Sequence, residues 1–198
     1  MSRLFSIKPA ITLKGRKFKG IRGWAGKPTH PPLTDIPIGA YVLAAAFDVI
    51  AYAAAKRGGP GSLSYDFFVS ATHVLIAGAI VSVFTAITGF WDWLKSTPRG
   101  TQAWRTANWH MAVMLTVTAL VIVDIFWRLN SFQEYTANGP SIALTLLTVI
   151  VGGLVAYGSA YGGSLVFDYE FNVEQDKGYA WEKSEEDHQP GTDTNPST

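Results

Sequence analysis

The chain has 198 residues, of which 48% are hydrophobic and 16% are charged, and its formal net charge is +1 at pH 7. Soluble domains carry about 25% charged residues, so this composition favours a membrane protein over a soluble enzyme, and we expect no nucleic-acid partner. Cysteine is absent, which excludes disulfides, thiolate metal sites and cysteine nucleophiles.

Four apolar stretches are long enough to cross a bilayer, which takes about 20 residues. They run from Ile36 to Ala55, from Phe67 to Leu94, from Thr106 to Trp127 and from Ser141 to Phe167. We therefore predict an all-α fold, a polytopic membrane protein built as a four-transmembrane-helix bundle. We assign residues 26–173 to this domain, residues 1–25 to a basic juxtamembrane arm, and residues 174–198 to an acidic tail whose composition is typical of disorder.

The basic residues are distributed unevenly between the two sides of the predicted bundle. With four spans, thirteen of the sixteen Lys and Arg residues fall on one side, and the other side holds only Lys56, Arg57 and Arg128. The positive-inside rule then places both termini in the cytoplasm. The first thirty residues contain no apolar segment of the signal-peptide type. We expect a multi-pass protein of the cell inner (plasma) membrane.

Ionisable side chains inside a span are costly unless they are paired or hydrated, so each one indicates a candidate site. Asp48, His73 and Asp124 fall in one layer on the extracytoplasmic side when their depth is counted along the helices. We predict an intramembrane polar pair of Asp48 and His73. Such a pair can be a charge-assisted hydrogen bond that ties two helices together, or it can be part of a proton relay.

A second polar layer lies on the cytoplasmic side and contains His30, Asp35, Asp92 and His110. Haem requires neutral imidazoles, usually two that face each other at one depth, and His30 and His110 meet the depth condition. They are our candidate ligands of a haem b iron, with Arg105 as the partner of a propionate. The alternative is a haem-free polar cluster in which Asp35 and Asp92 accept hydrogen bonds from the imidazoles.

Four segments occur in an order that resembles a known membrane family. They are GKPTHPPLTDIPIG with Asp48 in the helix after it, AITGFWDWL, RTANWHMAVML and SAYGGSLVFDYEFNV. This combination, from Gly26 to Val173, is similar to the family catalogued as domain of unknown function 2231. The resemblance implies a four-helix membrane domain of uncharacterised activity, in some members joined to Rieske-type iron–sulfur domains. Since this chain has no cysteine, an iron–sulfur partner would be a separate polypeptide.

No Walker, Rossmann, GxSxG, HExxH or CxxC pattern is present, so no familiar soluble enzyme is indicated and we expect a non-catalytic module. The resemblance favours a membrane anchor or a b-type haem subunit of an electron-transfer assembly. Its partners would be the lipid bilayer and other redox-complex subunits. Two alternatives stay open: a small transporter or proton-conducting bundle that uses Asp48 and His73, and a structural membrane protein without a ligand.

Overall fold

The computed structural model describes residues 20–23, 27–55 and 59–171, and these residues contain five helices. Four of the helices are long and one is short; they are α1 (His30–Ala53), α2 (Leu63–Ser96), α3 (Gln102–Asn130), α4 (Phe132–Asn138) and α5 (Ile142–Phe167). The only β-type pairing within the described part of the chain is an isolated bridge between Arg22 and Pro28. The predicted all-α fold is confirmed. The proposed arm and tail, residues 1–25 and 174–198, lie almost entirely outside the described residues.

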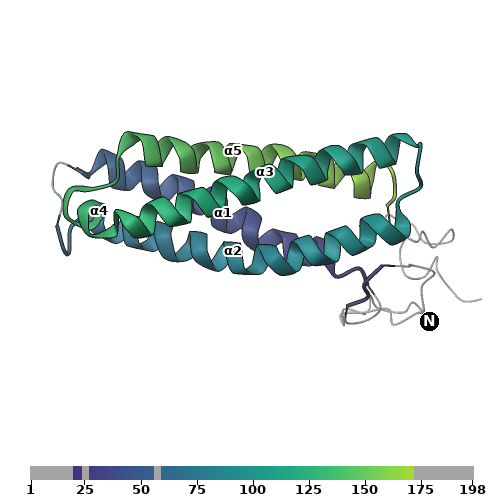
Figure 1. The fold of residues 1–198 in the computed structure, drawn as a ribbon, viewed down its shortest axis with the longest axis horizontal. Helices are drawn as coiled ribbons and strands as arrows, with labels where there is room; N and C mark the ends of the chain where they lie inside the picture. Colours follow the sequence, from purple (N-terminus) through teal and green to yellow (C-terminus); the bar gives the residue numbers. More distant parts are fainter. Residues whose placement is uncertain (1–19, 24–26, 56–58, 172–198) are drawn as a thin grey trace, which may run out of the picture.

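The four long helices run side by side as one elongated bundle (Figure 1). α1 packs on α2 and on α5, α3 packs on α5, and the contacts between α2 and α3 are fewer. Around the bundle axis, α1 and α3 therefore lie on one diagonal and α2 and α5 on the other. Both ends of the described chain lie at the same end of the bundle (Figure 1). Successive long helices alternate in direction, so α1 and α3 run the same way.

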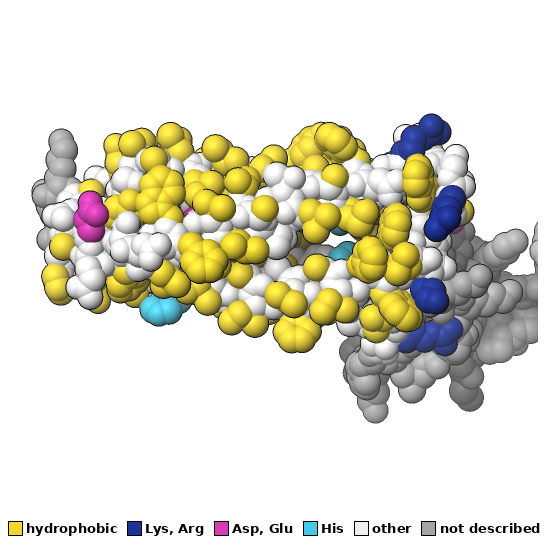
Figure 2. Space-filling model, in the orientation of Figure 1, with side chains coloured by type: hydrophobic (Ala, Val, Ile, Leu, Met, Phe, Trp, Pro, Cys, Tyr) yellow, Lys and Arg dark blue, Asp and Glu magenta, His cyan; other side chains and the backbone are white. Residues whose placement is uncertain are grey.

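All four long helices are apolar and long enough to cross a membrane. Large apolar side chains cover the outside of the bundle, as at Phe126, which is 66% exposed, and Lys and Arg gather at one end (Figure 2). α2 has 34 residues and a length of about 50 Å, so it extends beyond a hydrocarbon core of about 30 Å. This is the surface of a membrane protein, with apolar sides toward lipid and charged ends toward water.

α1 begins at His30, six residues earlier than the predicted start of the first span at Ile36. Pro31 and Pro32 lie in its first turn, where a missing N–H costs nothing because the amides there have no helical partner. Pro37 lies deeper and removes the hydrogen bond that the carbonyl of Leu33 would normally accept. The hydroxyl of Thr85 on α2 donates to that carbonyl at 3.4 Å. The carbonyl that Pro37 leaves without a helical partner therefore links α1 to α2.

Each of the other long helices begins with a Ser or Thr whose side chain accepts a hydrogen bond from the amide three residues on. These N-cap residues are Ser62, Thr101 and Ser141. Gly139, just before α5, has a φ of +83°, and a Cβ there would lie 2.5 Å from the Cβ of Ala55. Only glycine fits this turn, which is what lets the α4–α5 connection pack against the end of α1.

An apolar cluster occupies the middle of the bundle and receives residues from all four long helices. It consists of Tyr41, Ala44, Ala71, Leu75, Val117, Val121, Val151 and Val155. Along α1 and α3, this cluster separates two polar sites. One lies toward the end where Lys and Arg gather, and the other lies toward the end that carries α4.

Four spans place the two ends of the chain on one side of the membrane. A reporter that is active on a single side should give the same readout at Met1 and at Thr198, and the opposite readout at Gly59 in the α1–α2 connection. Fusions at these three positions measure this directly. Opposite readouts at the two termini would contradict the four-span fold.

Candidate functional site

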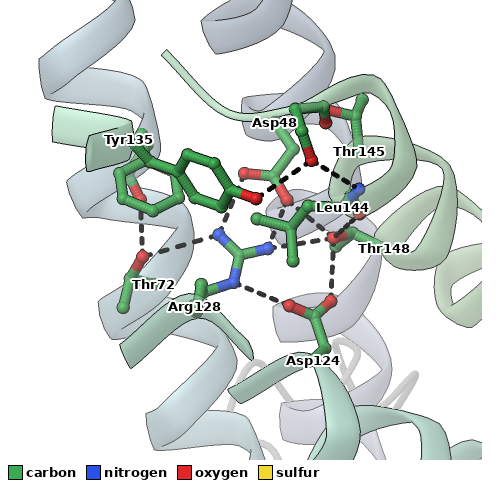
Figure 3. A network of polar contacts seen from close by, with 10 residues as sticks. Asp48, Thr72, Asp124, Arg128, Tyr135, Leu144, Thr145 and Thr148 are labelled. Atoms are coloured by element: carbon green, nitrogen blue, oxygen red, sulfur yellow. Dashed lines mark hydrogen bonds and ion pairs between the residues drawn. The ribbon is translucent and has the colours of Figure 1, made fainter. Parts of the chain in front are cut away.

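A buried network of charged side chains lies in the half of the bundle that carries α4 (Figure 3). At its centre is Arg128 of α3, whose side chain is 0% exposed. Its Nη1 donates to Oδ1 of Asp48 on α1 at 3.0 Å, and its Nη2 donates to Oδ2 of the same carboxylate. Its Nε donates to Oδ1 of Asp124, one turn back on α3, at 2.8 Å. One guanidinium therefore holds two carboxylates from two helices.

Two threonines extend the network to the remaining helices. Oγ1 of Thr148 on α5 lies 2.7 Å from Oδ2 of Asp48 and 2.8 Å from Oδ2 of Asp124. A hydroxyl has one hydrogen, so it donates to one of these carboxylates at a time. Nη1 of Arg128 lies 3.5 Å from Oγ1 of Thr72 on α2. Every charged atom of the network has a partner, and all four long helices are joined through it.

The predicted pair of Asp48 and His73 is not formed. Asp48 is bonded to Arg128 and Thr148 instead, and His73 is exposed on the outside of α2. The sequence reasoning placed Arg128 with the loop residues of the outer side, whereas it lies inside the bundle. A signal for it was present, because Asp124 and Arg128 are four residues apart in an apolar span and so share a helix face.

The second site lies near the other end of the bundle, where His30 on α1 and His110 on α3 lie on one diagonal. Nδ1 of His30 is 3.0 Å from the carbonyl oxygen of Thr85 on α2. Nδ1 of His110 is 2.8 Å from the carbonyl oxygen of Gly158 on α5. A carbonyl can only accept, so each Nδ1 carries the hydrogen. In the neutral imidazole this leaves Nε2 with a free lone pair.

A glycine makes room for each of these imidazoles. A Cβ on Gly89 of α2 would lie 2.5 Å from Cε1 of His30, and a Cβ on Gly162 of α5 would lie 3.1 Å from Cε1 of His110. Each glycine comes four residues after the residue whose carbonyl accepts the hydrogen bond, so it lies one turn along the same helix face. The arrangement of histidine, carbonyl and glycine therefore occurs twice, once on each side of the bundle axis.

A hollow opens between α2 and α3, and histidine side chains, in cyan, are visible inside it (Figure 2). Of the described histidines, His30 and His110 are partly buried and His73 is exposed. Nε1 of Trp93 on α2 donates a hydrogen bond to Oδ1 of Asn108 on α3, at 2.8 Å, and so links the two helices that border the hollow. The hollow therefore lies beside the partly buried histidines of the bundle.

The spacing along α1 and α3 aligns the two polar sites. His30 precedes Asp48 by 18 residues, and His110 precedes Arg128 by 18 residues. Eighteen residues make five helical turns, so in each helix the histidine and the charged residue lie on one face, about 27 Å apart. Because the ion pair holds Asp48 beside Arg128, the equal spacing brings the two histidines to the same level.

The other residues predicted for this layer lie elsewhere. Asp35 is exposed, and the buried carboxylate of Asp92 accepts a hydrogen bond from the backbone N–H of Ile21 at 3.1 Å. Arg105 is exposed and lines a groove between α3 and α5. The predicted cluster of Asp35 and Asp92 with His30 and His110 is therefore not formed. The imidazoles have backbone carbonyls as partners instead.

The donor set fits haem better than a bare metal ion. Within the described ranges, no group of three or more His, Cys, Asp or Glu side chains is placed to hold a metal. Structural zinc and iron–sulfur centres need about four protein ligands. A haem iron needs only two, because the porphyrin supplies the other four, and two neutral imidazoles are the residue type that would hold it.

Over residues 26–175 the chain matches the model of a family described as "Predicted membrane protein (DUF2231)". The matched region contains all four long helices and both polar sites. No curated protein and no solved structure matches the chain. The family description agrees with the apolar surface of the bundle and names no activity.

Replacing Arg128 with Gln should lower the free energy of unfolding by about 3–5 kcal/mol, because two carboxylates are left buried without their positive partner. Asp48→Asn should cost less, about 1–3 kcal/mol, because the amide oxygen still accepts one hydrogen bond from Arg128 while its NH2 group faces a second donor. Denaturant or thermal unfolding in detergent measures both values, with the exposed loop residue Arg99, changed to Gln, as the control. Equal losses for Arg128→Gln and Arg99→Gln would show that the network does not hold the helices together.

Proposed function

The chain belongs to the DUF2231 family of predicted membrane proteins, and from the paired histidines of its bundle we propose that it binds a b-type haem. His30 and His110 are the proposed axial ligands of the iron. Haem sites in helical bundles are built in this way, from side chains on facing helices that project into the core. The proposed role is that of an electron-transfer module in the membrane.

The duplicated contact of each histidine with a backbone carbonyl carries this proposal. Histidine ligands almost always donate their other ring N–H to a carbonyl, a carboxylate or water, which fixes the tautomer and the orientation of the ring. Nδ1 of His30 and Nδ1 of His110 both do so, at 3.0 and 2.8 Å. Each contact also satisfies a partly buried N–H group, and its occurrence at one histidine on each of two helices is the observation that favours a shared ligand.

The surroundings of His30 and His110 also favour the proposal of a flat ligand between their imidazole rings. Gly89 and Gly162 allow each imidazole to lie close against a neighbouring helix. The open side between α2 and α3 (Figure 2) gives a large ring system a place to extend. The propionates have no assigned partner, since Arg105 lines a groove on another side of α3.

The haem would supply one-electron exchange, and the chain's own residues would hold and insulate it. The apolar cluster around Tyr41 and Val117 closes the site toward the middle of the membrane. An apolar surrounding of this kind excludes water and influences the reduction potential. The proposed partners are other subunits of a redox assembly, such as an iron–sulfur protein.

The proposed site would lie toward the cytoplasm. Arg128 is inside the bundle, so Lys56 and Arg57 are the remaining basic residues of one side, against thirteen on the other. The positive-inside rule with this count favours cytoplasmic termini in an inner (plasma) membrane. A transport function has no comparable support, because the ion pair of Asp48 and Arg128 is fully enclosed by its own partners.

The protein purified in detergent from haem-replete cells should show a Soret band that shifts on reduction with dithionite. His30→Ala and His110→Ala should each lose that shifted band, because each removes one axial ligand. His73→Ala is the matched control, since His73 is exposed on the lipid-facing side of α2. A wild-type protein without a Soret band would remove the proposal.

The glycines provide a second test that leaves both histidines in place. A Cβ at Gly162 would press on the imidazole of His110, whereas a Cβ at Gly153 on the same helix would meet nothing within 4 Å. Gly162→Val should therefore lower the haem content or broaden the Soret band, and Gly153→Val should change neither. Comparison of haem-to-protein ratios in the two variants measures this. Equal ratios would mean that the tight contact at Gly162 has no part in haem binding.

A further inference from the structure

An open groove of about 280 Å³, lined by both apolar and polar atoms, lies between α3 and α5 near the end of the bundle where Lys and Arg gather. It is lined by Gln102, Arg105, Thr106, Trp109, Tyr157 and Tyr161. We propose that this groove, hereafter the α3–α5 groove, binds the anionic phosphate headgroup of a phospholipid. The inference does not depend on haem, since the α3–α5 groove lies outside the hollow that contains the histidines.

The chemistry of the lining is that of an anion site. Arg105 supplies a permanent positive charge, and the lining contains no Asp or Glu. The side chain of Arg105 makes no ion pair within the described part of the chain. The amide of Gln102 and the hydroxyl of Thr106 add hydrogen-bond donors beside it. A phosphate ester offers several acceptor oxygens and one negative charge, which matches one cation surrounded by neutral donors.

Three aromatic residues, Trp109, Tyr157 and Tyr161, line one side of the α3–α5 groove, and hydrogen bonds link their polar atoms. Nε1 of Trp109 donates to the hydroxyl of Tyr157 at 3.3 Å, and the hydroxyls of Tyr157 and Tyr161 are 2.9 Å apart. The two tyrosine rings meet edge to face, with centroids 5.1 Å apart. Trp and Tyr in such positions are typical of the headgroup level of a bilayer, because their rings are apolar and their tips are polar.

The surface next to the α3–α5 groove favours a lipid over free phosphate. Toward the middle of the membrane, the next exposed positions along the two helices are small: Ala112 on α3, and Ala156 and Gly153 on α5. A Cβ at Gly153 would meet nothing within 4 Å. Small residues on both helices leave a shallow path along the seam, where an acyl chain can lie below a bound headgroup. A free anion would make no use of this path.

The test is lipid binding to the full-length protein in a neutral detergent, followed by native mass spectrometry. Phosphatidylglycerol should bind with defined stoichiometry, and phosphatidylcholine with the same acyl chains should bind more weakly. Arg105→Gln should weaken phosphatidylglycerol binding roughly tenfold, as expected for the loss of one charge-assisted hydrogen bond. Arg99→Gln, an exposed basic residue that does not line the groove, should leave the affinity unchanged.

Three outcomes would overturn the proposal. Equal binding of the two lipids would show that the headgroup charge is not recognised. Equal weakening by Arg105→Gln and Arg99→Gln would indicate general attraction between a basic surface and an anionic lipid. Competition by millimolar inorganic phosphate, with the same dependence on Arg105, would show a site for the free anion instead. The haem spectrum of Arg105→Gln should equal that of the wild type, which keeps this test separate from the proposed function.

Discussion

The ion pair between Arg128 and Asp48 is the interaction on which the arrangement of the bundle depends. A guanidinium enclosed inside the bundle has no water to bind, so its donors must find acceptors within the protein. Arg128 finds them on α1, on its own helix and on α5, through Asp48, Asp124 and Thr148. A shift of one helix along another would separate these atoms. The network therefore fixes how far each long helix is displaced relative to its neighbours.

That fixed register extends to the other polar site. The five-turn spacing from His30 to Asp48 equals the spacing from His110 to Arg128, and α1 and α3 run in the same direction. Once the charged residues are paired, the histidines are level. The apolar cluster between the two sites, with Val117 on α3 among its members, is closely packed and does not absorb small displacements. A site that needs two imidazoles at one height thus gains its geometry from an ion pair about 27 Å away.

Composition and span length were sufficient to predict the four helices, because a lipid-facing helix must be apolar over about 20 residues. The start of α1 was predicted too late, since prolines in a first turn resemble a loop in the sequence although they are well suited to a helix start. The partner of Asp48 was predicted wrongly because depth does not reveal which face a residue occupies. His73 and Thr72 are neighbours at nearly equal depth, yet His73 is exposed and Thr72 is buried. Rotation about the helix axis depends on packing, and the sequence carries that information in two spacings: the four residues between Asp124 and Arg128, and the equal intervals along α1 and α3.

The two polar sites satisfy buried groups by different physical means. At the ion pair, opposite charges offset the cost of desolvation, and that makes the site rigid but leaves no acceptor free for a ligand. At the histidines, the partner is a helix carbonyl, which already accepts one backbone hydrogen bond and has a second lone pair to offer. This contact buries no charge, so it needs no counter-ion in the membrane. In a neutral imidazole it also fixes the tautomer, so that Nδ1 carries the proton and Nε2 does not. A carboxylate partner would have brought a buried negative charge to each ring, whereas the hydrogen-bond partners of the two Nδ1 atoms are the neutral carbonyls of Thr85 and Gly158.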